Sequence, residues 1–377
     1  MTRTCDVLVL GGGIAGASVA AFLAPHVRVV VLEREDQPGY HSTGRSAAMF
    51  MEGYGSTQVR ALTRASRAFF EAPPEGFCES PILKPRGALT VAAADQVDAL
   101  RAEHAVLSAH SDRVEWLDGA TARAMVPVLR PDAAVQALLD ASAMEMDVDV
   151  LYQGYLRYAK RHGCDVVTRA ETTAIRRDGA GWLVETASER YASAVVVDAA
   201  GAWADHVARL AGVATIGLIP KRRAAFTFDP PPGVAIDGWP MVLAADESWY
   251  FKPDAGLLLG SPANADPVEA HDVQAEELDI AIAIDRIETA TTLTIRRPAH
   301  VWAGLRSFVA DGDLVGGFAP DAPGFFWLAA QGGYGVQTSA AMGEACAHLI
   351  RGLRIPAAIA DEGLSAASLG PGRLSGT

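Results

Sequence analysis

The stretch Cys5-Asp6-Val7-Leu8-Val9-Leu10-Gly11-Gly12-Gly13-Ile14-Ala15-Gly16, followed by alanine-rich residues and by Val27 to Glu33, decides the fold. An apolar run, a glycine turn, a small-residue segment and a second apolar run ending in an acid predict one βαβ unit. Gly11 allows the tight turn, Gly13 lets the backbone approach a pyrophosphate, and Gly16 lets the helix pack closely on the strand. The helix start offers N–H groups to phosphates, and Glu33 can bind the adenosine ribose. The sequence therefore predicts a dinucleotide site.

Length, composition and charge set the broad class of the protein. With 377 residues, half of them hydrophobic and a fifth charged, the chain has material for two or three domains of a globular enzyme. A net charge of −13 and a pI near 5.1 argue against nucleic acid and anionic membrane surfaces as partners. We predict no membrane span, because no apolar run approaches about 18 residues. The first strand starts near residue 5, which leaves no room for a signal peptide, so we expect a cytoplasmic location.

Cysteine and histidine spacing gives no sign of a metal site. The four cysteines, Cys5, Cys78, Cys164 and Cys346, are scattered without a C-x-x-C pair, and the nine histidines form no ligand cluster. We therefore expect reduced, structural thiols and no bound metal.

The segment after the second apolar run is rich in hydroxyl groups and glycine. Ser42, Thr43 and Arg45 can hydrogen-bond phosphate or ribityl oxygens, and Ser46-Ala47-Ala48 is predicted to begin a helix. The alternative is an ordinary capped helix start without a ligand.

Later parts of the chain repeat the strand-to-glycine pattern. Ala194 to Val197 is a buried strand that we expect beside the first one in a parallel sheet, and Ala199-Ala200-Gly201 follows it. Near the C-terminus a strand at 325–330 leads into Gln331-Gly332-Gly333-Tyr334-Gly335 and a helix at 339–349. A second helix start suits a flavin, whose reduced form is negatively charged at its N1/C2=O edge. A plain buried strand and turn is the alternative.

Short strands without intervening helices lie between these two regions. They cover residues 223–228, 241–244, 249–252 and 257–259. This pattern favours an antiparallel sheet in a separate layer. The fold prediction is α/β: a Rossmann-like dinucleotide domain, plus an α+β domain built on a mostly antiparallel sheet.

Several of these motifs together resemble the FAD-dependent D-amino acid oxidase/glycine oxidase superfamily. They are Gly11–Gly16 with Glu33, His41–Ser46, Ala199–Trp203, Gly304–Phe308 with Asp311-Gly312, and Gly332–Gly335. Within the superfamily, residues 38–48, 220–223 and 259–273 are similar to the bacterial D-arginine dehydrogenases. The resemblance covers essentially the whole chain.

The resemblance implies a non-covalent FAD and a discontinuous FAD-binding domain. That domain comprises residues 1–85, 145–215 and 300–377, and the substrate domain comprises 86–144 and 216–299. The residues assigned to the cofactor are Gly11, Gly13, Ile14, Ala15, Gly16, Glu33, Arg34, Ser42, Thr43, Arg45, Ser46, Ala47, Ala48, Thr173, Ala200, Gly201, Trp203, Arg306, Gly332, Gly333, Tyr334, Gly335, Val336, Gln337 and Thr338.

The resemblance also implies the reaction, which is hydride transfer from Cα of a D-amino acid to flavin N5. The imino acid then hydrolyses to a 2-oxo acid and ammonia, and the electrons pass to a quinone or similar acceptor. Arg223 and Arg306 hold the substrate carboxylate, Tyr54 and Tyr250 close on it, and Gly333 belongs to the same catalytic set. Arginine forks match a carboxylate with two parallel hydrogen bonds.

Two departures from the D-arginine dehydrogenases bear on the substrate. Met49 replaces a histidine, and Ala88 replaces the glutamate that pairs with a cationic side chain. A lost desolvated ion partner costs several kcal/mol. We therefore predict neutral or hydrophobic D-amino acids rather than basic ones. The residues predicted to form the substrate pocket are Met49, Met51, Ala88, Met241 and Leu243.

Three other functions are compatible with the same sequence. A flavin amine oxidase of the glycine or sarcosine type would use O₂. A 2-hydroxy acid dehydrogenase would use the same arginines for its substrate carboxylate. A non-catalytic flavin-binding subunit would bind FAD but be reduced by neither amine nor hydroxy acid.

Overall fold

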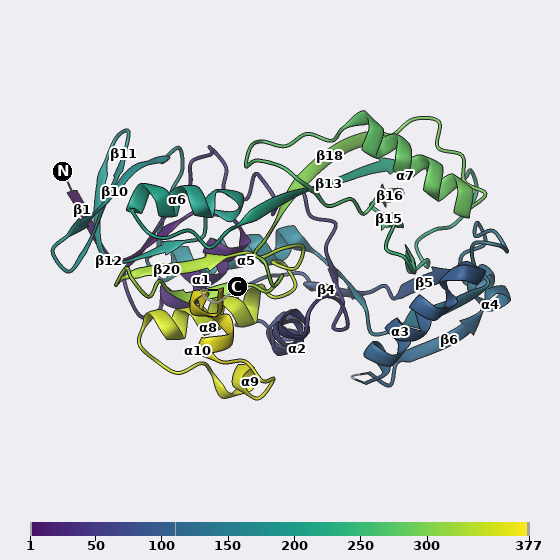
Figure 1. Ribbon diagram of the computed structural model, residues 1–377, viewed down its shortest axis with the longest axis horizontal. Coiled ribbons are helices and arrows are strands. Elements are labelled where there is room, and N and C mark those ends of the chain that lie inside the picture. Colours follow the sequence, from purple (N-terminus) through teal and green to yellow (C-terminus); the bar gives the residue numbers. More distant parts are fainter. Residues whose placement is uncertain (1, 110, 375–377) are drawn as a thin grey trace.

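The computed structural model describes residues 2–109 and 111–374, and two large β-sheets lie toward opposite ends of its longest dimension (Figure 1). The parallel strands of the first sheet are, in spatial order, β9 (Asp165–Val167), β2 (Val29–Leu32), β1 (Thr2–Leu10), β12 (Arg190–Asp198) and β20 (Phe325–Ala329). Its antiparallel strands are β10 (Thr172–Asp178), β11 (Gly181–Thr186) and β19 (Val315–Phe318). The predicted parallel pairing of the first strand with the strand at 194–197 is confirmed.

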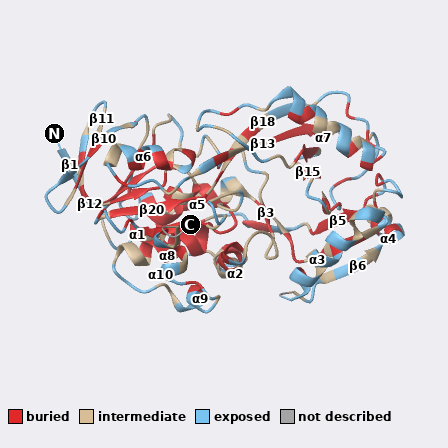
Figure 2. Ribbon diagram, viewed as in Figure 1, coloured by how far each residue is buried: buried red, intermediate tan, exposed pale blue. Residues whose placement is uncertain are grey.

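Both faces of the first sheet are buried, as its continuous apolar strands predict. Val7 and Val9 of β1 point into one hydrophobic core, whereas Leu8 and Leu10 point into the other. This is the two-residue period of a strand. Figure 2 shows the strands around β1 and β12 as largely buried.

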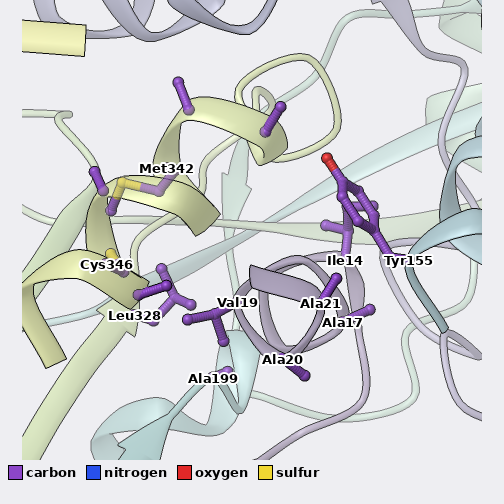
Figure 3. Packing of buried hydrophobic residues seen from close by; sticks show 14 of the residues in the cluster. Ile14, Ala17, Val19, Ala20, Ala21, Tyr155, Ala199, Leu328, Met342 and Cys346 are labelled. Atoms are coloured by element: carbon purple, nitrogen blue, oxygen red, sulfur yellow. The ribbon is translucent and has the colours of Figure 1, made fainter. Parts of the chain in front are cut away.

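One face of this sheet is covered by four helices, two of which begin at a side-chain cap. The covering helices are α1 (Ile14–Leu23), α2 (Thr57–Glu71), α5 (Val148–Arg161) and α8 (Ser339–Ile350). Ser56 caps α2 by accepting from the N–H of Val59, and Asp147 caps α5 by accepting from that of Val150. Small residues of α1, such as Ala17 and Ala20, let it lie close to its neighbours, as Figure 3 shows. The opposite core includes α6 (Ala204–Ala211).

The second sheet is mostly antiparallel, as predicted. Its strands, in spatial order, are β18 (His300–Phe308), β13 (Ile219–Phe228), β16 (Leu257–Ser261), β15 (Tyr250–Asp254), β14 (Met241–Ala244), β5 (Ala88–Ala92), β7 (Gln136–Asp140) and β6 (Val114–Asp118), with β17 (Asp266–Pro267) also on β13. Only the pair of β14 with β5 is parallel among these strands. The predicted domain boundary at residue 300 falls at the start of β18, which pairs with β13 in this sheet.

Two helices cover the outer face of the second sheet, and a third helix packs on its inner face. The helices α4 (Gly119–Met125) and α7 (Glu277–Ala290) cover the outer face, whereas α3 (Val97–Ser108) packs on the inner face, where its Leu100 shares a cluster with Leu138. Ile280 and Ile287 of α7 pack in one core with Phe226. Ala225 and Tyr250 belong to a separate small cluster on the inner face.

A small third sheet connects the two large ones and corrects one prediction. Its strands are β3 (Met49–Phe50), β8 (Met144–Met146) and β4 (Leu83–Pro85). Residues 46–48 do not begin a helix; they lead directly into β3. Met49 and Phe50 are buried and pair with β8, so tertiary contacts outweigh the local helix signal.

The remaining elements are short. They are η1 (Ala94–Gln96), η2 (Gly201–Trp203), α9 (Ala357–Ala360), α10 (Ala366–Leu369) and η3 (Pro371–Leu374). Within the described residues, none of the helices has the length and apolar character that crossing a bilayer requires.

Candidate active site

The turn between β1 and α1 is tight and exposes the start of the helix. Gly11 has a φ of 106°, which only glycine adopts readily. A Cβ on Gly16 would lie 1.9 Å from the carbonyl oxygen of Gly11, so only glycine fits here as well. Gly13 is the N-cap residue of α1 and has no side chain that could occupy the N–H groups of the helix start. The first turn of α1 contains no acidic residue. The positive end of α1 is therefore available to an anion.

Glu33 ends β2 beside this turn. Its Oε2 accepts from the N–H of Gly12 at 2.8 Å, and its Oε1 accepts from the N–H of Glu35 at 3.0 Å. These bonds orient the carboxylate, and each oxygen keeps a lone pair for a ribose hydroxyl. The Arg34 guanidinium lies 4.0 Å from the centroid of the Trp203 ring.

A cavity of about 180 Å³ opens over this turn, and we call it the glycine-turn cavity. Twelve of the predicted cofactor residues line it: Gly11, Gly13, Ile14, Ala15, Glu33, Arg34, Ser42, Thr43, Ala200, Gly201, Trp203 and Gly332. Thr172 lines it in place of the predicted Thr173, whose hydroxyl donates to the carbonyl of Glu185 at 3.1 Å.

Two further cavities continue the glycine-turn cavity toward the second sheet. The first, the junction cavity, contains Thr43 and Gly332 from the glycine-turn cavity and also Arg223 and Arg306. Other predicted residues that line it are Ile14, Ser42, Arg45, Ser46, Ala47, Tyr250, Gly333, Gly335 and Val336. The second, the arginine cavity, shares Arg223, Arg306 and Gly333 with the junction. The three cavities therefore adjoin one another, through shared lining residues, between Glu33 and the two arginines.

The residues around this space fit an FAD molecule. Glu33 lies at the end suited to the adenosine, and the start of α1 is suited to the pyrophosphate. The junction cavity, flanked by Gly332 and Gly333, leaves the position next to the arginines for the flavin ring. An FAD placed in this way would present its ring to the arginine cavity.

Arg223 and Arg306 reach the arginine cavity from neighbouring strands. Arg223 pairs with Gly304 in the register of β13 and β18, so Arg306 lies diagonally two residues away on the same face. A Cβ on Gly333 would lie 2.8 Å from Nη1 of Arg306, so the turn after β20 supports this guanidinium closely. Sequence reasoning named both arginines, but only the register places them together.

The two guanidinium groups have no carboxylate partner in the part of the chain that the structure describes. Arg223 Nε donates to the carbonyl of Asn264 at 2.5 Å, and no ion pair involves either arginine among residues 2–109 and 111–374. Burial and the charge of Arg306 lower the pKa of Arg223. Two cations side by side, one of them largely desolvated, favour the binding of an anion.

Tyr54 and Tyr250 line the arginine cavity as predicted. Tyr250 is 7% exposed and projects from β15. Tyr54 lies in the segment before α2, and its ring is 5.4 Å from that of Tyr334. A Cβ on Gly53 would meet Leu107 Cδ2 at 1.7 Å, so this segment packs directly against α3.

Four of the five residues predicted to form the substrate pocket line the arginine cavity, together with one acidic residue that was not predicted. Met49, Met51, Met241 and Leu243 line the arginine cavity. The fifth, Ala88, does not line the cavity; it pairs with Met241 behind the lining residues and is 2% exposed. The sequence analysis missed Glu247, an exposed residue in the turn between β14 and β15 that also lines the cavity.

Four predicted cofactor residues lie near the cavities without lining them. Gly16 is inside α1, and Thr173 is in β10. Tyr334 packs against Phe308, and burial raises its pKa to about 12. The Thr338 hydroxyl donates to the carbonyl of Tyr334 at 2.9 Å and so stabilises the turn.

Polar side chains of the segment after β2, including the predicted cofactor residue Arg45, bond to protein groups beside the cavities. Arg45 donates to the carbonyls of Val273 and Ala303 at 2.9 and 3.1 Å and pairs with Asp272. His41 lies 2.9 Å from Glu35. Arg45 thus ties the segment after β2 to the second sheet.

Glu103 of α3 provides a pH-dependent stability prediction. Thr90 Oγ1 donates to its Oε1 at 2.9 Å, but burial raises the pKa of this carboxyl above its ordinary value of 4.5. An acid with a raised folded-state pKa reduces stability as the pH rises through and above 4.5. Glu103→Gln should therefore raise the Tm, and the gain should be larger at pH 8 than at pH 5.

Thermal unfolding followed by circular dichroism checks this expectation. Glu75→Gln, at an exposed position, is the matched control and should show no such pH-dependent gain. An equal gain for Glu103→Gln at both pH values would contradict the argument.

No group of three or more His, Cys, Asp or Glu side chains among the described residues is arranged to hold a metal.

The chain matches the family described as FAD dependent oxidoreductase over residues 6–349. It is 25% identical over 364 residues to a glycine oxidase of Geobacillus kaustophilus, which covers 93% of this chain and 94% of that protein.

Solved structures share this fold along nearly the whole chain. L-proline dehydrogenase from P. horikoshii superposes with a TM-score of 0.84 at 19% identity, covering 100% of this chain and 99% of that one. Dithionite-reduced L-alpha-glycerophosphate oxidase from Mycoplasma pneumoniae, with FAD bound, gives 0.83 at 18% identity and covers 93% and 95%.

Proposed function

The chain belongs to the FAD-dependent oxidoreductase family, and we propose that within this family it oxidises D-amino acids to imino acids. The observation that carries this proposal is the pair Arg223 and Arg306, which face one cavity without a carboxylate partner among the described residues. A substrate carboxylate would be the anionic partner of these two guanidinium groups. The motifs that resemble D-amino acid oxidoreductases support the amine and the D configuration.

The cavity residues would bind and orient the substrate. Two guanidinium forks fix the carboxylate and thereby the face that Cα presents to the flavin ring. Tyr54 and Tyr250 exclude water above it. When bound, FAD supplies the two-electron acceptor for the hydride that leaves Cα. The amine loses a proton, and water hydrolyses the imino acid to a 2-oxo acid and ammonia.

The lining of the cavity supports neutral or hydrophobic side chains. Met49, Met51, Met241 and Leu243 offer flexible apolar contacts. Glu247 is exposed, so water screens its charge, and an exposed ion pair contributes at most about 1 kcal/mol. Glu247 therefore disfavours acidic substrate side chains. It does not replace the buried carboxylate that is missing at position 88, where this chain has alanine.

Reduction of the flavin under anaerobic conditions tests the substrate class. We expect D-Leu, D-Met and D-Phe to bleach the visible absorbance and their L forms not to do so. We expect kcat/KM for these three to exceed that for D-Arg and D-Lys by roughly tenfold or more, because a desolvated cation without a partner costs a few kcal/mol. A kcat/KM for D-Arg well above the others would contradict this preference.

The second candidate is oxidation of glycine or another small amine with O₂, which the full-length glycine oxidase relative favours. Peroxide formation in air, compared with dye or quinone reduction, separates the two. A 2-hydroxy acid also suits the arginine pair and belongs in the same substrate panel. A protein that binds FAD but is bleached by none of these compounds would be a non-catalytic subunit.

The narrower resemblance to D-arginine dehydrogenases rests on the sequence motifs, and we propose it only for the shared reaction type. We further propose a non-covalent FAD, a quinone-type electron acceptor and a cytoplasmic location. Cys5, Cys78, Cys164 and Cys346 are free thiols, which suits a reducing compartment. We also propose the two-domain division predicted above, with β18 assigned to the second sheet.

A further inference from the structure

A carboxamide with an unused donor lies in the wall of the arginine cavity. Gln337 is 4% exposed and sits in the turn between β20 and α8. Its Oε1 accepts from the N–H of Met51 at 3.2 Å. Its Nε2 is buried and has no hydrogen-bond partner. Folded proteins rarely leave a buried donor unsatisfied, so this amide points to a ligand.

The bond to Met51 fixes which end of the amide is free. A backbone N–H can only donate, so it selects the oxygen of Gln337 and leaves the NH₂ group as the unused end. Gln337 lines the arginine cavity together with Arg306 and Gly333. It does not line the junction or glycine-turn cavities, which would hold the dinucleotide.

We infer that Gln337 is a positioning residue that donates to the substrate carboxylate and links its binding to Tyr54. The inference rests on the proposed function, because it takes the ligand of the arginine cavity to be a carboxylate. Sequence analysis assigned Gln337 to the cofactor; the structure favours the carboxylate as its acceptor.

A short chain of hydrogen bonds provides the link. Gln337 holds the N–H of Met51, and the Met51 carbonyl accepts from the N–H of Tyr54 at 3.3 Å. Tyr54 lines the same cavity as the two arginines and packs on Tyr334. A carboxylate that accepts from the NH₂ group of Gln337 fixes the plane of this side-chain amide. The bond from the same amide to Met51 then holds the segment 51–55 in place.

The test uses the FAD-loaded full chain and 4-methylpentanoate, the carboxylate of leucine without its amine. Binding is followed by the change in flavin absorbance. We expect Gln337→Leu to raise the Kd about tenfold, the loss of one hydrogen bond to a charged group, and to change the Kd of FAD less than twofold. Gln153→Leu, at a half-buried position of α5 that lines none of the three cavities, is the matched control and should leave both values unchanged.

Gln337→Glu separates ligand contact from a structural role. Its carboxylate keeps an acceptor for Met51 but places a negative oxygen where the NH₂ group was. We expect weaker binding than in Gln337→Leu at neutral pH and partial recovery in acid. A wild-type Kd for 4-methylpentanoate in this variant would overturn the inference, because the hydrogen bond to Met51 alone would then be enough for carboxylate binding.

Hydrogen exchange reports the link to the segment 51–55. We expect 4-methylpentanoate to protect the amides of residues 51–55 in the wild type and to protect them less in Gln337→Leu. A changed FAD Kd with an unchanged 4-methylpentanoate Kd would overturn the inference in favour of a cofactor contact. So would a wild-type protein that does not bind 4-methylpentanoate. If the variants behave as expected but no D-amino acid bleaches the flavin, the proposed reaction fails and the carboxylate contact stands.

Discussion

Replacing Arg306 by methionine is expected to lower kcat/KM for the best D-amino acid by about 10²–10³-fold. The substitution removes one of the two guanidinium groups that face the arginine cavity. Losing one partner of a buried, hydrogen-bonded charge pair costs about 2–5 kcal/mol. Gly333 would also lose the guanidinium that packs on it. Arg306→Lys keeps the charge but loses the two-pronged geometry, so we expect an intermediate loss.

Steady-state kinetics with FAD content measured by absorbance checks this result. Arg297→Met, at an exposed position that does not line the arginine cavity, is the matched control and should leave kcat/KM within twofold. A fully FAD-loaded Arg306→Met protein with wild-type kcat/KM would remove the main support for the carboxylate site.

Replacing Gly16 by alanine is expected to weaken FAD binding by roughly 10²-fold or to yield protein without flavin. The new Cβ would lie 1.9 Å from the carbonyl oxygen of Gly11. Because that contact is with backbone, α1 must shift away from the turn at Gly11–Gly13. Overpacking of this kind costs about 1–3 kcal/mol, and the shifted helix start no longer meets the pyrophosphate in place.

Titration of the flavin-free protein with FAD, followed by flavin fluorescence, measures the effect. Gly238→Ala is the matched control, because no atom lies within 4 Å of the added Cβ and the residue has no positive φ. Wild-type FAD affinity in Gly16→Ala would show that the predicted phosphate site is wrongly placed.

The sequence predicted which residues of the glycine turn lie together, because the signals there are local. The turn at Gly11, the helix start at Gly13 and the acid at Glu33 lie within 23 residues, and the structure keeps all three together. Chain geometry alone brings such residues together once the strand and helix form. The same reasoning fails at Ser46-Ala47-Ala48, where pairing of β3 with β8 overrides a local helix signal.

The substrate part of the site depends on contacts between distant segments. Arg223 and Arg306 are 83 positions apart and meet only because β13 and β18 pair in the observed register. A shift by one residue would turn one of them to the opposite face. Nothing in the sequence near Glu247 shows that its turn opens onto the cavity, and the free end of Gln337 is set by a bond to Met51.

The sequence by itself determined the βαβ unit, the cofactor class that its glycines and Glu33 suit, and the two-sheet architecture. Side-chain periodicity and glycine stereochemistry act over a few residues and can be read directly from the chain. Tertiary structure alone decided which strands pair, which arginines face one cavity and which buried donor is left free. These features follow from strand register and packing between segments tens to hundreds of residues apart, which local propensities do not specify.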